Sequence, residues 1–142
     1  MKINVSVIIP FYDNYVYLNR TLKSVLKQTY KNYEIIIIND NPDKKKNFQL
    51  VKLKIKIGKK KNIKIINNNK NYGPGISRNK GIVVAKGQYL AFLDSDDTWD
   101  KNKLLIQLKI MKKNKYVVSH TSYNLVDINR NYISSRIARN LN

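Results

Sequence analysis

Apolar residues in this chain fall into short separate runs, and the spacing within each run predicts its element. Four runs are nearly continuous, the first three of them rich in valine or isoleucine: residues 5–10, 34–38, 63–66 and 89–93. This pattern is typical of strands that are buried on both faces. Residues 15–28 instead space their leucines and valine at helical intervals, which predicts a helix with one apolar face and Asn14 as its N-cap. Strand, helix and strand in succession predict a right-handed βαβ unit.

Later segments predict two more helices, another strand and a hairpin. Helical spacing marks residues 76–85 and 101–114, and Asp100 is placed to cap the second of these helices. Residues 116–121 predict a fifth strand. Residues 43–62 contain helical and alternating patterns, of which we favour the helix. Two stretches around a turn predict a β-hairpin: residues 123–127 and 132–137.

The alternation of strands and helices predicts an α/β fold, with a mostly parallel sheet flanked by helices and a C-terminal β-hairpin. The length of 142 residues suits a single domain, and no internal boundary or repeat is evident. No apolar run approaches the roughly 18 to 20 residues that cross a bilayer, and residues 1–10 lack a secretory signal pattern. Because the chain also has no cysteine, we expect it in the cytoplasm.

The formal net charge of +19 indicates an anionic partner, such as nucleic acid, anionic lipid or a phosphorylated substrate. Lysine far outnumbers arginine, and asparagine and isoleucine are abundant, which favours a general compositional bias over a dedicated polyanion surface. Peripheral contact with an anionic inner membrane face is still expected. A basic nucleic-acid-binding module is the weaker alternative, because the lysines are dispersed and no RNA-binding or zinc motif is present. We expect no nucleic-acid partner.

Carboxylates are scarce in this chain, and four of its nine acidic residues lie within seven positions: Asp94, Asp96, Asp97 and Asp100. Neighbouring carboxylates repel one another unless a cation or hydrogen-bond donors offset their charge. Side chains at positions i and i+2 after a strand can leave a loop in similar directions, so Asp94 and Asp96 could share a divalent cation with a diphosphate. The alternative is an acidic loop that only stabilises the next helix N-terminus, which explains Asp100 well.

Other polar residues also follow predicted strands. In open α/β sheets the ligand crevice lies beyond the carboxyl ends of the strands, so Tyr12 and Asp40 should converge with the acidic cluster. Tyr12 could pack against a base or sugar, and Asp40 could accept hydrogen bonds from a base edge. Residues 71–79 bring glycines and Arg78 to a helix start, which suits the approach of an anion. We interpret His120, the sole histidine, as structural.

These motifs resemble, in order and spacing, those of family 2 glycosyltransferases, inverting enzymes with the Rossmann-like GT-A fold. The matching segments are VSVIIPFYD at residues 5–13, SVLKQTY at 24–30, IINDN at 37–41, NYG and SRNKGI within 71–82, and GQYLAFLDSDD at 87–97. Asn39 stands where the family usually carries the first of two aspartates, and Asp40 keeps the second.

The resemblance implies a nucleotide diphosphate sugar donor, with a UDP-sugar expected, and a divalent cation, Mn²⁺ or Mg²⁺. It also implies a glycan or lipid-linked acceptor in surface polysaccharide synthesis. Asp96 is the expected metal ligand, with Asp94 as a second candidate. Carried over by position, the expected donor-binding residues are Pro10, Tyr12, Asp40, Arg78, Asp94, Ser95 and Asp96.

In this family the general base and most of the acceptor pocket come from the C-terminal half. We therefore expect the general base beyond Asn142, and we interpret residues 1–142 as a single nucleotide-sugar-binding domain whose acceptor portion is missing. Asp127 lies in a predicted hairpin turn and is not assigned the role. A truncated, non-catalytic binder of nucleotide sugars is the alternative to a transferase. It would bind UDP with Mn²⁺ without transferring or hydrolysing the donor.

Overall fold

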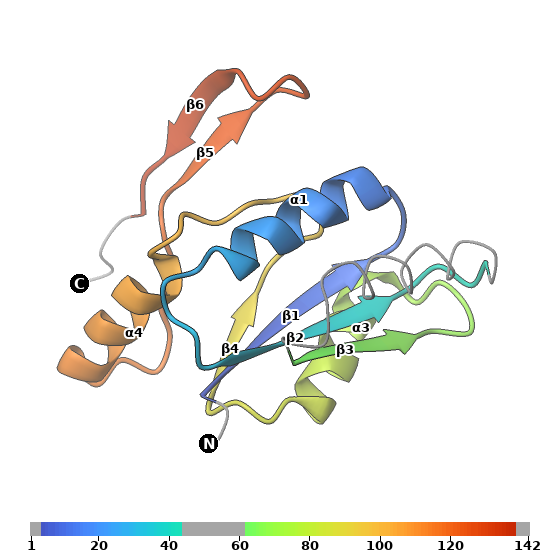
Figure 1. Cartoon of the computed structure of the whole chain (residues 1–142), viewed down its shortest axis with the longest axis horizontal. Coiled ribbons are helices and arrows are strands. Elements are labelled where there is room, and N and C mark those ends of the chain that lie inside the picture. Colours follow the sequence, from blue (N-terminus) through green and yellow to red (C-terminus); the bar gives the residue numbers. More distant parts are fainter. Residues whose placement is uncertain (1–3, 44–61, 139–142) are drawn as a thin grey trace. The chain divides into compact units, whose positions relative to one another are not determined.

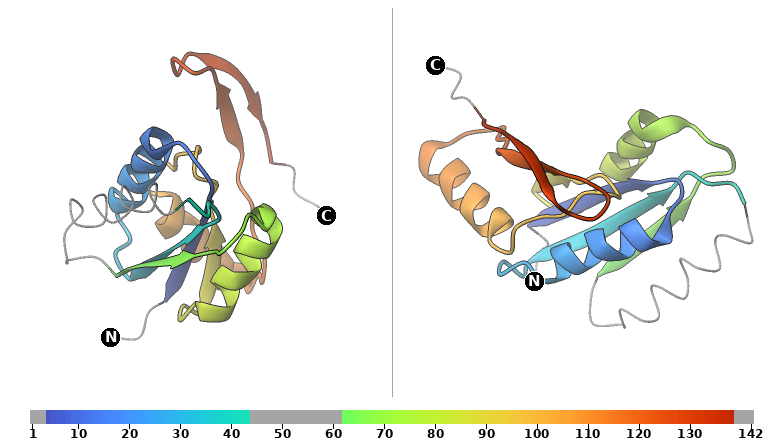
Figure 2. Two further views of the ribbon diagram at one scale, coloured as in Figure 1. Left: turned by 90° about the vertical axis from the view of Figure 1, so that its right-hand side faces the viewer. Right: turned by 90° about the horizontal axis from the view of Figure 1, so that it is seen from above.

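The computed structural model describes residues 4–43 and 62–138. Within them, a four-stranded parallel sheet has the order β3-β2-β1-β4 (Figure 1). Its strands are β1 (Val5–Phe11), β2 (Tyr33–Asn39), β3 (Ile63–Asn67) and β4 (Tyr89–Phe92). Helix α1 (Tyr15–Leu26) covers one face of the sheet and α3 (Gly73–Val84) covers the other, as Figure 2 shows. The predicted α/β class is confirmed.

Strands β1 and β2 form the centre of the core. Every residue of both strands is buried, and they pair in register from Val5 opposite Tyr33 to Phe11 opposite Asn39. A sheet covered by helices on both faces buries both sets of alternating side chains, which explains why these runs are apolar without alternation. The buried apolar residues of α1 are those that its spacing predicted: Leu18, Leu22 and Val25.

The two helices begin in different ways. Asn14 caps α1 as predicted, because its Oδ1 accepts a hydrogen bond from the backbone N–H of Tyr17 at 3.3 Å. Helix α3 begins at Gly73 and not at residue 76 as predicted. The glycines and proline of that segment indicated a loop, but proline is well accommodated in a first helical turn, where its missing N–H leaves no bond unmade.

The chain divides into two compact units, residues 1–104 and residues 105–142. Helix α4 (Lys103–Asn114) contains the boundary between them. In the second unit, β5 (Tyr123–Val126) and β6 (Tyr132–Arg136) form the predicted antiparallel hairpin. The expectation of a single domain stays a prediction.

The predicted fifth strand at residues 116–121 is wrong. None of these residues is in a strand, and Val117 and Val118 are 92% and 79% exposed. A β-branched sequence forms a strand only where a neighbouring strand supplies hydrogen bonds and a surface to pack on. Of the helix predicted within residues 43–62, residues 44–61 lie outside the described residues. No helix in the described ranges is long and apolar enough to cross a membrane.

Candidate donor-binding site

The carboxyl ends of β1, β2 and β4 adjoin at one edge of the sheet. On one side of β1, the backbone N–H of Asp40 donates to the carbonyl of Phe11 at 2.7 Å. On its other side, the N–H of Leu93 donates to the carbonyl of Ile8 at 3.1 Å. Because the three strands are parallel, the segments that follow them leave the sheet at this same edge.

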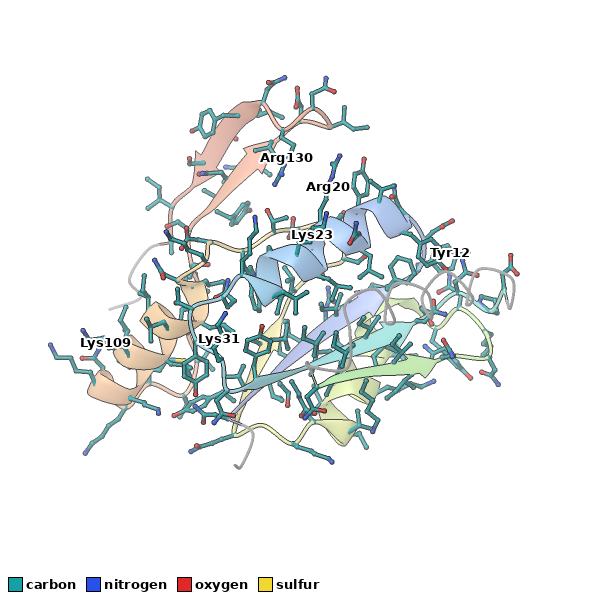
Figure 3. The ribbon with its side chains drawn as sticks, viewed as in Figure 1. Tyr12, Arg20, Lys23, Lys31, Lys109 and Arg130 are labelled. Carbon is teal, nitrogen blue, oxygen red and sulfur yellow. The ribbon has the colours of Figure 1, made fainter. Side chains whose placement is uncertain are left out.

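Two candidate residues, one within β1 and one just past its end, differ in exposure. Tyr12 lies just past the end of the strand and is 51% exposed, so its ring is available for packing against a ligand (Figure 3). Pro10 is buried within β1, where it pairs with Ile38. A contact between Pro10 and a nucleoside stays a prediction.

Asp40 is only 3% exposed, and its carboxylate holds the start of α3. Oδ1 accepts hydrogen bonds from Asn68 Nδ2 at 2.6 Å and from the N–H of Tyr72 at 2.9 Å, and Oδ2 accepts from the N–H of Gly73 at 2.7 Å. Helix α3 has no side-chain cap at its own N-cap position. Asp40, just past the end of β2, therefore supplies an acceptor and a favourable negative charge, beside the local acceptor Asn71 Oδ1, which lies 3.0 Å from the N–H of Gly73. Contact between Asp40 and a base stays a prediction.

Asn68, a residue that sequence reasoning missed, extends this network. It is 5% exposed, its Nδ2 also lies 3.3 Å from Ser77 Oγ, and its Oδ1 accepts from Lys80 Nζ at 2.7 Å. The same Nζ lies 4.0 Å from the ring centre of Tyr72. Asn68 belongs to a run of asparagines, in which no pattern distinguishes the buried member from its exposed neighbours.

Arg78 and Asp94 form an ion pair, with 2.5 Å between Nη2 and Oδ1 and side chains that are 34% and 52% exposed. Arg78 comes from α3 and Asp94 from the loop after β4. The structure thus brings together two residues that were predicted separately. Asp96, two positions further along the loop, is exposed.

The carboxylates of this loop crowd one another. The pKa of Asp97 is raised above its usual 3.8, chiefly by partial burial of its carboxyl and further by the charges of Asp96 and Asp94. The N–H of Asp97 donates to the carbonyl of Asp94 at 3.2 Å, a turn that keeps the cluster compact. Asp100 has a separate role: its Oδ1 accepts from the N–H of Asn102 at 2.8 Å, within the turn that precedes α4, which begins at Lys103 and not at residue 101 as predicted.

A divalent cation fits this loop only with help from a ligand. Within residues 4–43 and 62–138, no group of three or more His, Cys, Asp or Glu side chains could hold a metal. His120 is exposed and belongs to the other unit. Mg²⁺ and Mn²⁺ commonly take one or two carboxylates and complete their shell with phosphate and water. The donor set around Asp96 therefore suits a cation that arrives with a diphosphate.

The Glycosyl transferase family 2 profile matches residues 6–141. The chain belongs to this family. It is 43% identical over 131 residues to an uncharacterized glycosyltransferase of Rickettsia bellii, a match that covers 92% of this chain and 18% of the relative. It is 33% identical over 125 residues to the Escherichia coli protein named UDP-Glc:alpha-D-GlcNAc-diphosphoundecaprenol beta-1,3-glucosyltransferase WfgD, covering 88% of this chain and 47% of that relative.

Among solved structures, S. aureus TarS 1-349 in complex with UDP matches with a TM-score of 0.69 and 30% identity, over 79% of this chain and 33% of that TarS 1-349 chain. The similarity confirms the expected GT-A fold. The chain spans 18% and 47% of the lengths of the two relatives above.

Proposed function

We propose that this domain binds a nucleoside diphosphate sugar, with a UDP-sugar as the donor class, at the carboxyl ends of β1, β2 and β4. The observation that carries the proposal is the loop after β4, where the charges of Asp94, Asp96 and Asp97 lie close enough to repel one another and Asp94 pairs with Arg78. A cation would relieve this repulsion, and a diphosphate would complete the cation's ligand shell. The UDP bound to TarS and the UDP-Glc in the name of the E. coli relative support uridine as the nucleoside.

The residues of the site have separate roles in this proposal. Asp96 holds Mn²⁺ or Mg²⁺ with the diphosphate, and Asp94 is the second candidate, engaged by Arg78 before the donor arrives. Tyr12 packs against the nucleoside, and Arg78 is close enough to the loop to meet the diphosphate. When bound, the cation would stabilise charge on the leaving diphosphate. We assign no general base among the described residues.

We further propose that the whole protein transfers the sugar to a glycan or lipid-linked acceptor in surface polysaccharide synthesis, at the cytoplasmic face of an anionic membrane. The lipid-linked acceptor in the name of the E. coli relative and the net charge of +19 support this placement. In a sedimentation assay at low salt, the protein should pellet with anionic vesicles, and raising the salt should release it into the supernatant. Equal binding to uncharged vesicles would contradict the proposal that positive charge attracts the protein to the membrane.

A thermal-shift experiment tests donor binding. UDP with Mn²⁺ should raise the melting temperature of the wild type more than UDP with EDTA, because a ligand of the folded state stabilises it by mass action. Asp96→Asn should lose the Mn²⁺-dependent part of this shift. Asp100→Asn is the matched control, since it removes a nearby charge while its amide oxygen can still accept from Asn102. Equal protection of Asp96→Asn and the wild type would refute the metal assignment.

Two further measurements, of oligonucleotide binding and of sugar transfer, separate the alternatives. Oligonucleotide binding that UDP does not displace would favour the nucleic-acid module. UDP binding without transfer or donor hydrolysis by the whole protein would favour a non-catalytic binder.

A further inference from the structure

Helix α1 and the turn that follows it carry polar side chains that are buried or half-buried. Thr21 and Gln28 are fully buried, at 0% exposure, and Ser24 is half-buried between them. Thr21 and Ser24, three positions apart, lie on one side of α1, and Gln28 follows the last residue of the helix by two positions. Buried polar side chains are costly unless they are hydrogen-bonded, so each should have a partner.

The partners are backbone groups of the segment that follows β4. Thr21 Oγ1 lies 2.8 Å from the carbonyl of Ser95 and 2.8 Å from that of Asp97, closer than the 3.1 Å to the carbonyl of Tyr17 in its own helix. A hydroxyl has one hydrogen to donate, which Thr21 therefore shares among these acceptors. Its nearest acceptors are in the carboxylate loop, residues 94–97.

Ser24 on α1 and Gln28 just past its C-terminus contact later parts of the same segment. Ser24 Oγ accepts from the N–H of Trp99 at 3.1 Å. Gln28 donates from Nε2 to the carbonyl of Asp100 at 2.5 Å and accepts at Oε1 from the N–H of Leu104 at 3.0 Å. Residues 94–102 contain no helix or strand, so their backbone groups need side-chain or solvent partners.

The contacts of Thr21 bracket Asp96. The carbonyl of Ser95 lies in the peptide bond just before Asp96. The carbonyl of Asp97 lies in the peptide bond one residue after Asp96. Holding both carbonyls on one hydroxyl restricts the backbone on either side of Asp96 and the direction in which its side chain leaves the loop. Thr21 has no carboxylate of its own and contributes through this placement.

We infer that Thr21 is a positioning residue of the donor site, which sets the carboxylate loop so that Asp96 can hold a divalent cation together with the diphosphate. The inference rests on the proposed function and adds a residue of α1 to the site. A hydrogen bond that orients a metal ligand from outside the coordination shell commonly affects metal affinity by about 10 to 100-fold when removed.

Thr21→Val and Thr21→Ser test the inference on the full chain. Valine keeps the shape of threonine and removes the hydroxyl, whereas serine keeps the hydroxyl. UDP affinity is measured by calorimetry in Mn²⁺ and in EDTA, and Mn²⁺ bound in the presence of UDP is counted by electron paramagnetic resonance. In Mn²⁺ we expect about 10 to 100-fold weaker UDP binding for Thr21→Val and near wild-type binding for Thr21→Ser. In EDTA, both variants should bind UDP with the same affinity as the wild type.

Ser6→Ala is the control for a purely structural effect. Ser6 is also fully buried, and its hydroxyl donates to Glu34 Oε1 at 2.6 Å and accepts from the N–H of Gly87 at 2.9 Å. It lies near the beginning of β1, away from the strand ends that form the candidate site. Ser6→Ala should lower the melting temperature and leave the dependence of UDP affinity on Mn²⁺ unchanged.

The outcomes separate the inference from the proposed function. If the wild type shows no Mn²⁺-dependent UDP binding, the proposed function fails and the inference with it. If the wild type shows it and Thr21→Val keeps the same dependence, the inference is overturned while the proposed function stands. Should Thr21→Val fail to fold, Thr21→Ala replaces it, because it removes the hydroxyl without placing a methyl group against two carbonyls, and the same comparison decides.

Discussion

The carboxylate of Asp40 lies 2.7 Å from the backbone N–H of Gly73, so the end of β2 caps the start of α3. An anion was expected at this helix start from the glycines of residues 71–79. The structure places a protein carboxylate there, and a phosphate that approached the same N–H groups would be repelled by the negative charge of Asp40. Arg78, further along α3 and paired with Asp94, is therefore the better candidate for meeting the diphosphate.

Asp40→Asn should destabilise the chain by about 1.5 to 3 kcal/mol, the range for hydrogen bonds to charged groups. Both oxygens of Asp40 accept bonds, so an amide nitrogen in place of either one would face a donor. The free energy of unfolding in urea measures the effect. Asp96→Asn, at an exposed position, should change stability by no more than about 0.5 kcal/mol and serves as the control. Equal effects of the two variants would contradict the capping role.

Arg78→Gln should change the affinities for the metal ion and for the nucleotide in opposite directions. Removing the guanidinium frees Asp94, so Mn²⁺ alone should bind a few-fold more tightly, while UDP with Mn²⁺ should bind more weakly because a cation near the diphosphate is lost. Unfolding free energy should fall by no more than about 1 kcal/mol, as is usual for a partly exposed ion pair. Mn²⁺ titration by electron paramagnetic resonance gives the first quantity and calorimetry the second. A parallel change in both affinities would contradict the competition between Arg78 and the cation for Asp94.

The predictable parts of this structure are those with local signals. The buried strands, the face of α1 and the cap at Asn14 follow from spacing and residue type over a few positions. The acid cluster could be placed at a sheet edge because parallel strands share their carboxyl ends.

What sequence reasoning missed depends on residues distant in the chain. The cap of α3 comes from Asp40, 33 positions before Gly73, and no local pattern connects the two. Thr21 had a possible signal, since a polar residue next to Leu22 on a buried helix face needs a partner. The identity of that partner, 74 positions away at Ser95, required the fold.

Gly81→Ala should destabilise the chain even though alanine is the better helix former. A Cβ at Gly81 would lie 2.5 Å from Ile8 Cγ2, because α3 packs closely against β1 at this point. Overpacking of this kind costs about 1 to 3 kcal/mol, more than the roughly 0.5 to 1 kcal/mol that alanine gains in a helix. Gly75→Ala is the matched control, as nothing lies within 4 Å of its Cβ position, and it should be neutral or stabilising. Urea unfolding of both variants measures the contrast, and a stabilised Gly81→Ala would show that α3 can shift away from β1.

Tyr33→Phe should reveal a contribution of the Tyr33 hydroxyl to the free energy of unfolding, and this contribution should disappear at high pH. Burial raises the pKa of the Tyr33 phenol above its usual 10.0, and its hydroxyl donates to the carbonyl of Val25 at 2.9 Å. The native state thus holds this proton more tightly than the unfolded state, so the contribution is complete below pH 10.0 and is lost as the pH rises through the folded-state value. At neutral pH the variant should be about 1 kcal/mol less stable than the wild type, because it lacks the bond.

As the pH is raised past 10.0, this difference between Tyr33→Phe and the wild type should shrink, since only the wild type must ionise a buried phenol. The lysines titrate in both proteins and cancel in the comparison. Free energies of unfolding in urea, measured for both at neutral pH and at successive values above 10.0, give the difference directly. A difference that stays constant across this range would contradict the raised pKa of the Tyr33 phenol.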